Sequence, residues 1–211
     1  MTRRSVRAIR FLLLCVVLVS AVGCGSTDTS PAGGGNPKVP AGAKSSGGKH
    51  AVIDTDKGPI EIEFLETDAP KGVENFRLLA EHGYYDGLTF HRIVKGFMIQ
   101  GGDPTGTGSG GESAWGKPFP DNINPQSPLY QAGYKRGIVA YANAGPDTNG
   151  SQFFIMHMDY ELAPNYVIFA RVTSGMTAVD AIADVQTSLG DDGAASKPVL
   201  PQTIKTITVR P

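Results

Sequence analysis

The sequence predicts a mainly β fold, a closed eight-stranded antiparallel β-barrel capped by two α-helices. Short runs of apolar residues recur along the chain and are separated by glycines. Two stretches only have apolar residues at helical spacing. The 27 glycines and 15 prolines among 211 residues favour turns over long helices. Many short strands with few helices favour a barrel, because closing a sheet on itself leaves no strand edge unpaired.

Eight strands follow from these apolar runs. The chain alternates from residue 50 to residue 64 around Asp56-Lys57-Gly58, which is the pattern of a β-hairpin with a glycine-containing turn. A strand with alternating apolar residues closes the sheet over residues 203–210. Between them lie five further strand-like runs, over residues 88–94, 97–100, 137–142, 152–156 and 166–172.

Two helices complete the predicted fold. Asp68-Ala69-Pro70 is a helix-start signal, with Asp68 as the cap and the proline in the first turn, and Gly83 is a stop signal. The second helix is expected over residues 178–185, and residues 190–201 read as a polar loop.

The N-terminal segment has the pattern of an export signal. Four arginines among the first ten residues precede an apolar stretch over residues 11–22, shorter than the roughly 20 residues that span a membrane. We therefore interpret residues 1–23 as a signal peptide. Ala21-Val22-Gly23-Cys24 resembles the lipobox of bacterial lipoproteins, in which the cysteine is lipidated, for example by palmitate. An ordinary secretory signal remains the alternative, and the export route stays open between Sec and twin-arginine.

Residues 24–49 are rich in Gly, Ser, Pro, Thr and Ala and carry almost no large apolar residue. Such a composition does not bury a core, so we expect a flexible, lipid-anchored linker. The folded domain then occupies residues 50–211. The predicted location is the extracytoplasmic face of the cell membrane, held by a lipid on Cys24.

Composition excludes several classes of protein. Nineteen Lys and Arg against 20 Asp and Glu give a net charge of -1, which argues against a nucleic-acid partner. Both cysteines, Cys15 and Cys24, precede the predicted domain, which excludes a disulfide framework and a cysteine-based zinc site there. The four histidines show no metal-ligand spacing. We expect one domain without internal repeats, acting as a monomer.

Two runs carry the chemistry. Residues 90–103 read FHRIVKGFMIQGGD, and residues 141–155 read YANAGPDTNGSQFFI, with a loop rich in Gly, Asn and Pro. Both runs, in this order, resemble the signature blocks of the cyclophilin family, and the resemblance extends from residue 50 to the C-terminus. It implies a peptidyl-prolyl cis-trans isomerase that acts on proline-containing polypeptides to assist protein folding and needs no cofactor and no metal.

The resemblance also implies residue roles. Arg92 would be the catalytic residue and would hydrogen-bond the proline end of the substrate, with Gln100 and Asn143 as its catalytic partners. The substrate-binding residues would be Phe97, Met98, Gly108, Ala142, Ala144, Gln152, Phe154, Leu162 and Tyr166. Glu161 stands where many members have a tryptophan that contributes to cyclosporin binding, so weak cyclosporin sensitivity is expected.

An always-charged guanidinium suits this reaction. The barrier to rotation about an amide is about 18–20 kcal/mol, because resonance is lost in the twisted state. The proline nitrogen gains a lone pair there, to which Arg92 can donate a hydrogen bond. The alternative function is a binding module that holds proline-containing segments without turnover. The presence of Arg92, Gln100 and Asn143 favours the enzyme.

Overall fold

The computed structural model describes residues 37–211, and the fold is that of an eight-stranded antiparallel sheet with few helices. Predictions for the signal peptide, for Cys24 and for the first half of the linker lie outside these residues. Strands follow the order β10-β1-β2-β7-β5-β6-β4-β3. Their bounds are β1 His50–Thr55, β2 Gly58–Phe64, β3 Phe90–Val94, β4 Met98–Gly101, β5 Ile138–Tyr141, β6 Phe153–Met156, β7 Ile168–Ser174 and β10 Ile204–Arg210.

The sheet is open, so the prediction of a closed barrel is wrong. Strands β10 and β3 are its two edges and form no ladder with each other. The residues that lead into them meet at one isolated bridge, between Thr89 and Thr203, supported by the hydrogen bond from Ile204 N to Leu88 O at 2.7 Å. The pairing of β3 with β4 has a register shift between Phe90 and Arg92. Strand β9, and not β10, comes close to β3. The result is a half-barrel.

The strand register separates the two faces of the sheet. One row across β3, β4, β6 and β5 is apolar and fully buried in the main core, and it consists of Ile93, Ile99, Ile155 and Val139. The adjacent row faces the other side, where a second, smaller apolar cluster lies, and it consists of Arg92, Gln100, Phe154 and Ala140. Because side chains alternate along a strand, one row builds the core and the next builds a surface site.

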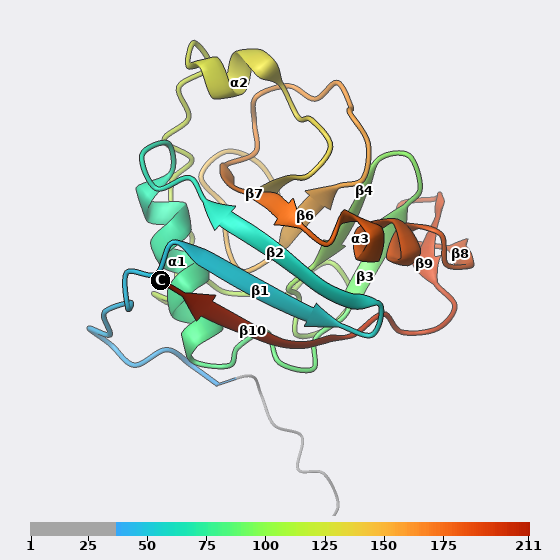
Figure 1. Cartoon of the computed structure of the whole chain (residues 1–211), viewed down its shortest axis with the longest axis horizontal. Coiled ribbons are helices and arrows are strands. Elements are labelled where there is room, and N and C mark those ends of the chain that lie inside the picture. Colours follow the sequence, from blue (N-terminus) through green and yellow to red (C-terminus); the bar gives the residue numbers. More distant parts are fainter. Residues whose placement is uncertain (1–36) are drawn as a thin grey trace, which may run out of the picture. The chain divides into compact units, whose positions relative to one another are not determined.

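Helix α1 (Pro70–Glu81) and helix α3 (Met176–Ala183) lie at opposite sides of the sheet (Figure 1). The cap of α1 is Ala69, without a side-chain hydrogen bond, so the predicted capping role of Asp68 is wrong. From within α1, the buried Asn75 donates hydrogen bonds to the Tyr141 hydroxyl at 3.0 Å and to Gly150 O at 2.9 Å. This helix therefore fixes the position of the loop between β5 and β6.

Two elements form where the sequence analysis predicted neither a helix nor a strand. Residues 190–201 contain most of a small hairpin, formed by β8 (Thr187–Leu189) and β9 (Ala195–Pro198). A short helix, α2 (Pro128–Ala132), begins at Ser127, whose side chain accepts a hydrogen bond from Tyr130 N. Figure 1 shows the hairpin next to β3 and α2 at the far end of the sheet from β8.

The described part of the predicted linker follows the surface of α1. Val39 and Ala43 pack against the main core, and Ser46 N donates a hydrogen bond to the Glu81 carboxylate at 3.0 Å. Lys49 O accepts a hydrogen bond from Phe64 N at 2.9 Å, which extends the sheet contacts just before β1. The small apolar side chains of Val39 and Ala43 are thus enough to pack this segment against the main core. Within residues 37–211, no helix is both long enough and apolar enough to cross a membrane.

Candidate active site

The side chain of Arg92 lies on the edge strand β3, at the end of the row that continues through Gln100, Phe154 and Ala140. Its Nη1 is 3.5 Å from Oε1 of Gln100, the residue directly opposite on β4, and 3.9 Å from the sulfur of Met98. Its Nε donates to Oδ2 of Asp192 at 2.7 Å. The Arg92 side chain is 33% exposed, so it is both held by neighbours and open to a ligand. A planar fork of donors with free positions can bind an acceptor on a substrate.

A continuous chain of polar groups extends from Arg92 across the sheet. Gln100 Nε2 donates to Gln152 Oε1 at 2.9 Å. Gln152 Nε2 in turn donates to the carbonyl oxygens of Gly108 at 3.0 Å and Gly110 at 2.8 Å. The structure thus brings Arg92, Gln100, Gln152 and Gly108 together, as the sequence predicted for a single site.

An apolar floor adjoins this polar chain. Met98 and Phe154 are almost fully buried, at 1% and 4% exposure, in the smaller apolar cluster. Phe97, Leu162 and Tyr166 are partly buried against the same cluster. The rings of Phe154 and Tyr166 meet edge to face at 5.5 Å. These five residues, all predicted to bind substrate, therefore lie on one patch beside Arg92.

Three aromatic residues of this patch were missed by the sequence reasoning. Tyr160 stacks on Phe97 with ring centroids 4.3 Å apart. Tyr134 accepts a hydrogen bond from Tyr166 N at 3.1 Å and donates to Tyr166 O at 2.9 Å. Tyr130 donates to Tyr166 O, and burial raises its pKa to about 12. Tyr130 lies in α2, Tyr134 lies just after it, and Tyr160 lies between β6 and β7, in segments that no apolar alternation marks in the sequence.

The loop that follows β5 forms the far wall. Asn143 Nδ2 donates to Asn165 O at 2.8 Å, which ties the loop to the segment that carries Tyr166. The backbone N–H groups of Ala142 and Ala144 are already engaged, by Gln152 O at 3.0 Å and by the Thr148 hydroxyl at 2.9 Å. Main-chain pairing of a peptide at these two alanines would therefore use their carbonyl oxygens.

The loop that carries Gly108 is organised by one buried carboxylate. Asp103 is 1% exposed and accepts hydrogen bonds from the backbone N–H groups of Thr105, Thr107, Gly108 and Gly110, at 2.6–3.2 Å. Burial alone would raise the pKa of this carboxyl group, but the hydrogen bonds from Thr105, Gly110 and Gly108 outweigh it and lower the pKa. Such a nest of N–H groups fixes the loop at the edge of the site.

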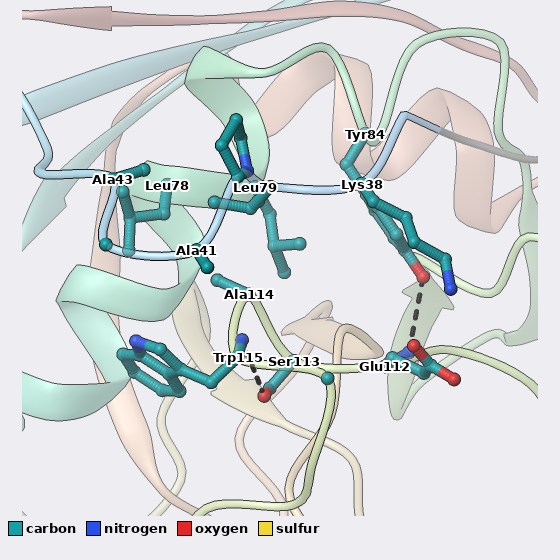
Figure 2. Close-up of a pocket in the computed structure, with 14 residues that line it drawn as sticks. Lys38, Ala41, Ala43, Leu78, Leu79, Tyr84, Glu112, Ser113, Ala114 and Trp115 are labelled. Atoms are coloured by element: carbon teal, nitrogen blue, oxygen red, sulfur yellow. Dashed lines mark hydrogen bonds between the residues drawn. The ribbon is translucent and has the colours of Figure 1, made fainter.

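Two hollows flank the site residues. One, of about 390 Å³, is bounded by Gln100, Gln152, Gly108 and the loop of Ala142 to Ala144. The other, of about 270 Å³, lies between Arg92 and the hairpin β8–β9. A larger hollow of about 520 Å³ lies elsewhere, between residues 38–43, the end of α1 and residues 112–116 (Figure 2). None of the predicted site residues lines it.

The comparisons with known proteins agree with this geometry. The family model described as "Cyclophilin type peptidyl-prolyl cis-trans isomerase/CLD" matches residues 50–209. The chain belongs to the cyclophilin-type isomerase family. This confirms the family expected from the two sequence runs. The match begins after the predicted signal peptide and linker.

Curated cyclophilins share close to half of the aligned residues. Peptidyl-prolyl cis-trans isomerase-like 1 of Rhizopus delemar is 48% identical over 149 residues, which cover 68% of this chain and 85% of the relative. The human protein of the same name is 48% identical over 143 residues, 67% of this chain and 84% of its own length. These relatives are eukaryotic, whereas the predicted lipoprotein form is bacterial.

Solved cyclophilin structures have the same architecture. A cyclophilin-type isomerase of Cryptosporidium parvum superposes with a TM-score of 0.69 at 36% identity, covering 78% of this chain and 98% of its own. A second structure of that protein was determined in the presence of the dipeptide Ala-Pro, with a TM-score of 0.69, 37% identity and coverage of 77% and 99%. The chain is thus a peptidyl-prolyl cis-trans isomerase of cyclophilin type.

Proposed function

We propose that this isomerase accelerates rotation about Xaa-Pro bonds in exported proteins, with the Arg92 guanidinium stabilising the twisted amide. The observation that supports this assignment is the position of Arg92 between a polar chain and an apolar floor. A proline ring needs an apolar surface, and the rotating amide needs a donor beside it. Both lie within one row of the sheet.

The catalytic effect of Arg92 rests on differential binding. In the planar amide the nitrogen lone pair is delocalised and accepts hydrogen bonds poorly, whereas in the twisted state it becomes available. A donor that contacts the lone pair therefore binds the transition state more strongly than the ground state. A charge-assisted hydrogen bond contributes about 1.5–3 kcal/mol, which corresponds to roughly one to two decades in rate.

The other site residues would orient the two partners. Met98 and Phe154 would hold the proline ring, while Gln100 and Gln152 would hold Arg92 and the substrate backbone through their shared hydrogen bond. Asn143 would fix the loop against which the extended peptide lies. No step in this rotation breaks a covalent bond, so the chemistry requires position and charge alone.

The experiment is a protease-coupled isomerase assay on a short Xaa-Pro peptide. Arg92→Ala is expected to lower kcat/KM by roughly 10- to 100-fold, the value of the lost charge-assisted bond. Arg92→Lys keeps the charge but not the fork, and is expected to fall in between. Arg171→Ala is the matched control, because Arg171 pairs with Glu63 at 2.7 Å on β7 and β2, away from the site. Unchanged activity in Arg92→Ala would remove the arginine from the mechanism.

We further propose that the protein is exported and held at the extracytoplasmic face of the cell membrane by a lipid on Cys24. The support is sequence pattern: the arginines near the N-terminus, the apolar residues 11–22 and the lipobox-like residues 21–24. Mass analysis of the mature protein is expected to show a diacylated Cys24 as the first residue. A mature chain with an unmodified N-terminus, or membrane retention of Cys24→Ala, would contradict the anchor.

A further inference from the structure

The tip of the hairpin β8–β9 reaches the arginine of the active site. Asp192 Oδ2 accepts a hydrogen bond from Arg92 Nε at 2.7 Å, across 100 positions of sequence. The two side chains are 28% and 33% exposed, so the contact is partly shielded from solvent. Among residues 37–211, Asp192 is the carboxylate that forms an ion pair with Arg92.

The carboxylate of Asp192 is itself held in place. Its second oxygen, Oδ1, accepts hydrogen bonds from the Ser196 hydroxyl at 2.6 Å and from Ala194 N at 3.1 Å. Ser196 is 2% exposed, which places the donor in the body of the hairpin and not on its surface. The two oxygens of Asp192 thus have separate partners: one fastens the carboxylate to the hairpin, and the other holds Arg92.

The hairpin that presents Asp192 is tight. Gly190 N donates to Ala194 O at 2.8 Å, and Gly193 N donates to Gly190 O at 3.1 Å. Gly193 has a φ of 74°, a left-handed conformation that glycine adopts without strain. Strand β9 comes close to β3, which carries Arg92. The Asp192 carboxylate is therefore held in one position by the hydrogen bonds within the hairpin and by the packing of β9 near β3.

We propose that Asp192 is a positioning residue for isomerisation, which orients the Arg92 guanidinium by holding its Nε edge. This inference rests on the proposed function of Arg92. With Nε occupied, the planar group is turned so that Nη1 faces Gln100 and Met98. Nη2 has no hydrogen-bond partner within residues 37–211 and is left for the substrate.

Positioning is favoured over inhibition by the number of donors that Asp192 occupies. The Nε–H group and Nη2 lie on the same edge of a guanidinium, so a carboxylate that blocked the site could take both. Asp192 accepts a hydrogen bond from Nε alone, and Nη1 lies beside Gln100 and Met98. A long, flexible arginine loses much rotamer freedom when it binds, so an arginine already held in place loses less.

The test compares three aspartate variants with the wild type in the same Xaa-Pro assay. Asp192→Ala is expected to lower kcat about three- to fivefold with little change in KM. A loss of kcat of this size corresponds to the removal of a partly exposed ion pair. Asp192→Asn keeps an oxygen that can accept from Nε, and is expected to recover part of the loss. Asp191→Ala removes the same charge one residue away, and is expected to stay within about twofold of the wild type, because charges near solvent are screened.

A spectroscopic readout separates positioning from a merely structural role. The Nε–H resonance of Arg92, assigned through its loss in Arg92→Ala, should be shifted and slowly exchanging in the wild type. It should move to the position of a free arginine in Asp192→Ala. Two results would overturn the inference: activity of Asp192→Ala equal to that of the Asp191→Ala control, or activity above the wild type, which would make Asp192 an inhibitory contact. If Arg92→Ala itself retains activity, the proposed function fails instead.

Discussion

The protein has two kinds of hollow, and the larger one is not the one that the chemistry favours. Beneath residues 38–43 lies a hollow of about 520 Å³ with largely small and apolar walls, among them Ala41, Leu79 and Ala114 (Figure 2). The hollows beside Arg92 measure about 390 and 270 Å³. The hollows differ in the polar groups that point into them. A binding site is marked by a few polar groups aimed at an apolar surface, and volume alone does not provide them.

The polar groups in the two regions have different roles. Around the larger hollow they hold the loop of residues 112–116 in shape: Glu112 N donates to the Tyr84 hydroxyl at 3.3 Å, and Ser113 Oγ accepts from Trp115 N at 3.2 Å. Around the site they form one connected chain from Asp192 through Arg92, Gln100 and Gln152 to Gly108. The first set stabilises a fold, and the second orients donors toward a ligand.

If the hollows beside Arg92 are the active site, removing part of the apolar floor should lower activity more than any change at the larger hollow. Leu162→Ala takes away a half-buried side chain at the smaller cluster. Burying such a side chain is worth about 1.5–3 kcal/mol when complete, so kcat/KM should fall roughly fivefold to tenfold. The protease-coupled assay measures it. Leu200→Ala is the matched control, because Leu200 is 71% exposed, and an equal loss in both variants would refute a pocket at Leu162.

A smaller effect is expected from the loop that carries Gly108. Asp103→Asn replaces with an amide the carboxylate that accepts hydrogen bonds from four backbone N–H groups. It should lower the free energy of unfolding by roughly 1–3 kcal/mol and kcat/KM by only about two- to threefold. Because the pKa of Asp103 is lowered in the folded state, its contribution to stability is present above the unfolded value of about 3.9. That contribution is lost as the pH falls further, through the folded pKa.

Denaturant unfolding of the wild type and of Asp103→Asn across a series of pH values checks this sign. The gap between the two free energies of unfolding should be widest near neutral pH and should close in acid. A gap that is constant with pH would mean that the charge of Asp103 does not organise the loop.

The smallest effect on catalysis is expected in the N-terminal segment, whose residues 38–43 line the larger hollow. Ser46→Ala removes the hydrogen bond from the Ser46 hydroxyl to the Glu81 carboxylate and keeps the one from the Ser46 backbone N–H. It should lower the free energy of unfolding by less than about 1.5 kcal/mol and leave kcat/KM unchanged. Thermal unfolding and the isomerase assay measure the two quantities on one preparation. A loss of activity that exceeds the loss seen with Leu162→Ala would reverse the ranking of the two regions.

The eight strands of the sheet were predictable because their signals are local. Alternating apolar residues and glycine-bounded runs locate each strand, and the runs of residues 90–103 and 141–155 contain the residues that the register later brings together. Arg92 and Gln100 face each other because β3 and β4 pair directly after a short turn, and Phe154 joins the row because β6 pairs with β4 after the long connection that contains α2 and β5. This part of the site is built into neighbouring strands.

The features that were missed depend on distant contacts. The openness of the sheet is the absence of a ladder between its edge strands β10 and β3, and the alternation within each strand carries no information about that pairing. Asp192 lies in a stretch of Gly, Asp and Ala without apolar alternation, so only its Asp-Gly dipeptide hinted at a hairpin turn. Its contact with Arg92 joins residues 100 positions apart. The predicted linker contains Val39 and Ala43, whose packing depends on where α1 ends.

The central claim is that Arg92 stabilises the twisted amide more than the planar one. The most direct measurement is NMR exchange between the cis and trans forms of an Xaa-Pro peptide at saturating Arg92→Ala protein, together with the Kd of the same peptide. The exchange rate on the Arg92→Ala protein is expected to be lower by at least about tenfold, with a Kd within about threefold of the wild type. An unchanged exchange rate with a greatly weakened Kd would show that the arginine merely binds the ground state, and would contradict the account.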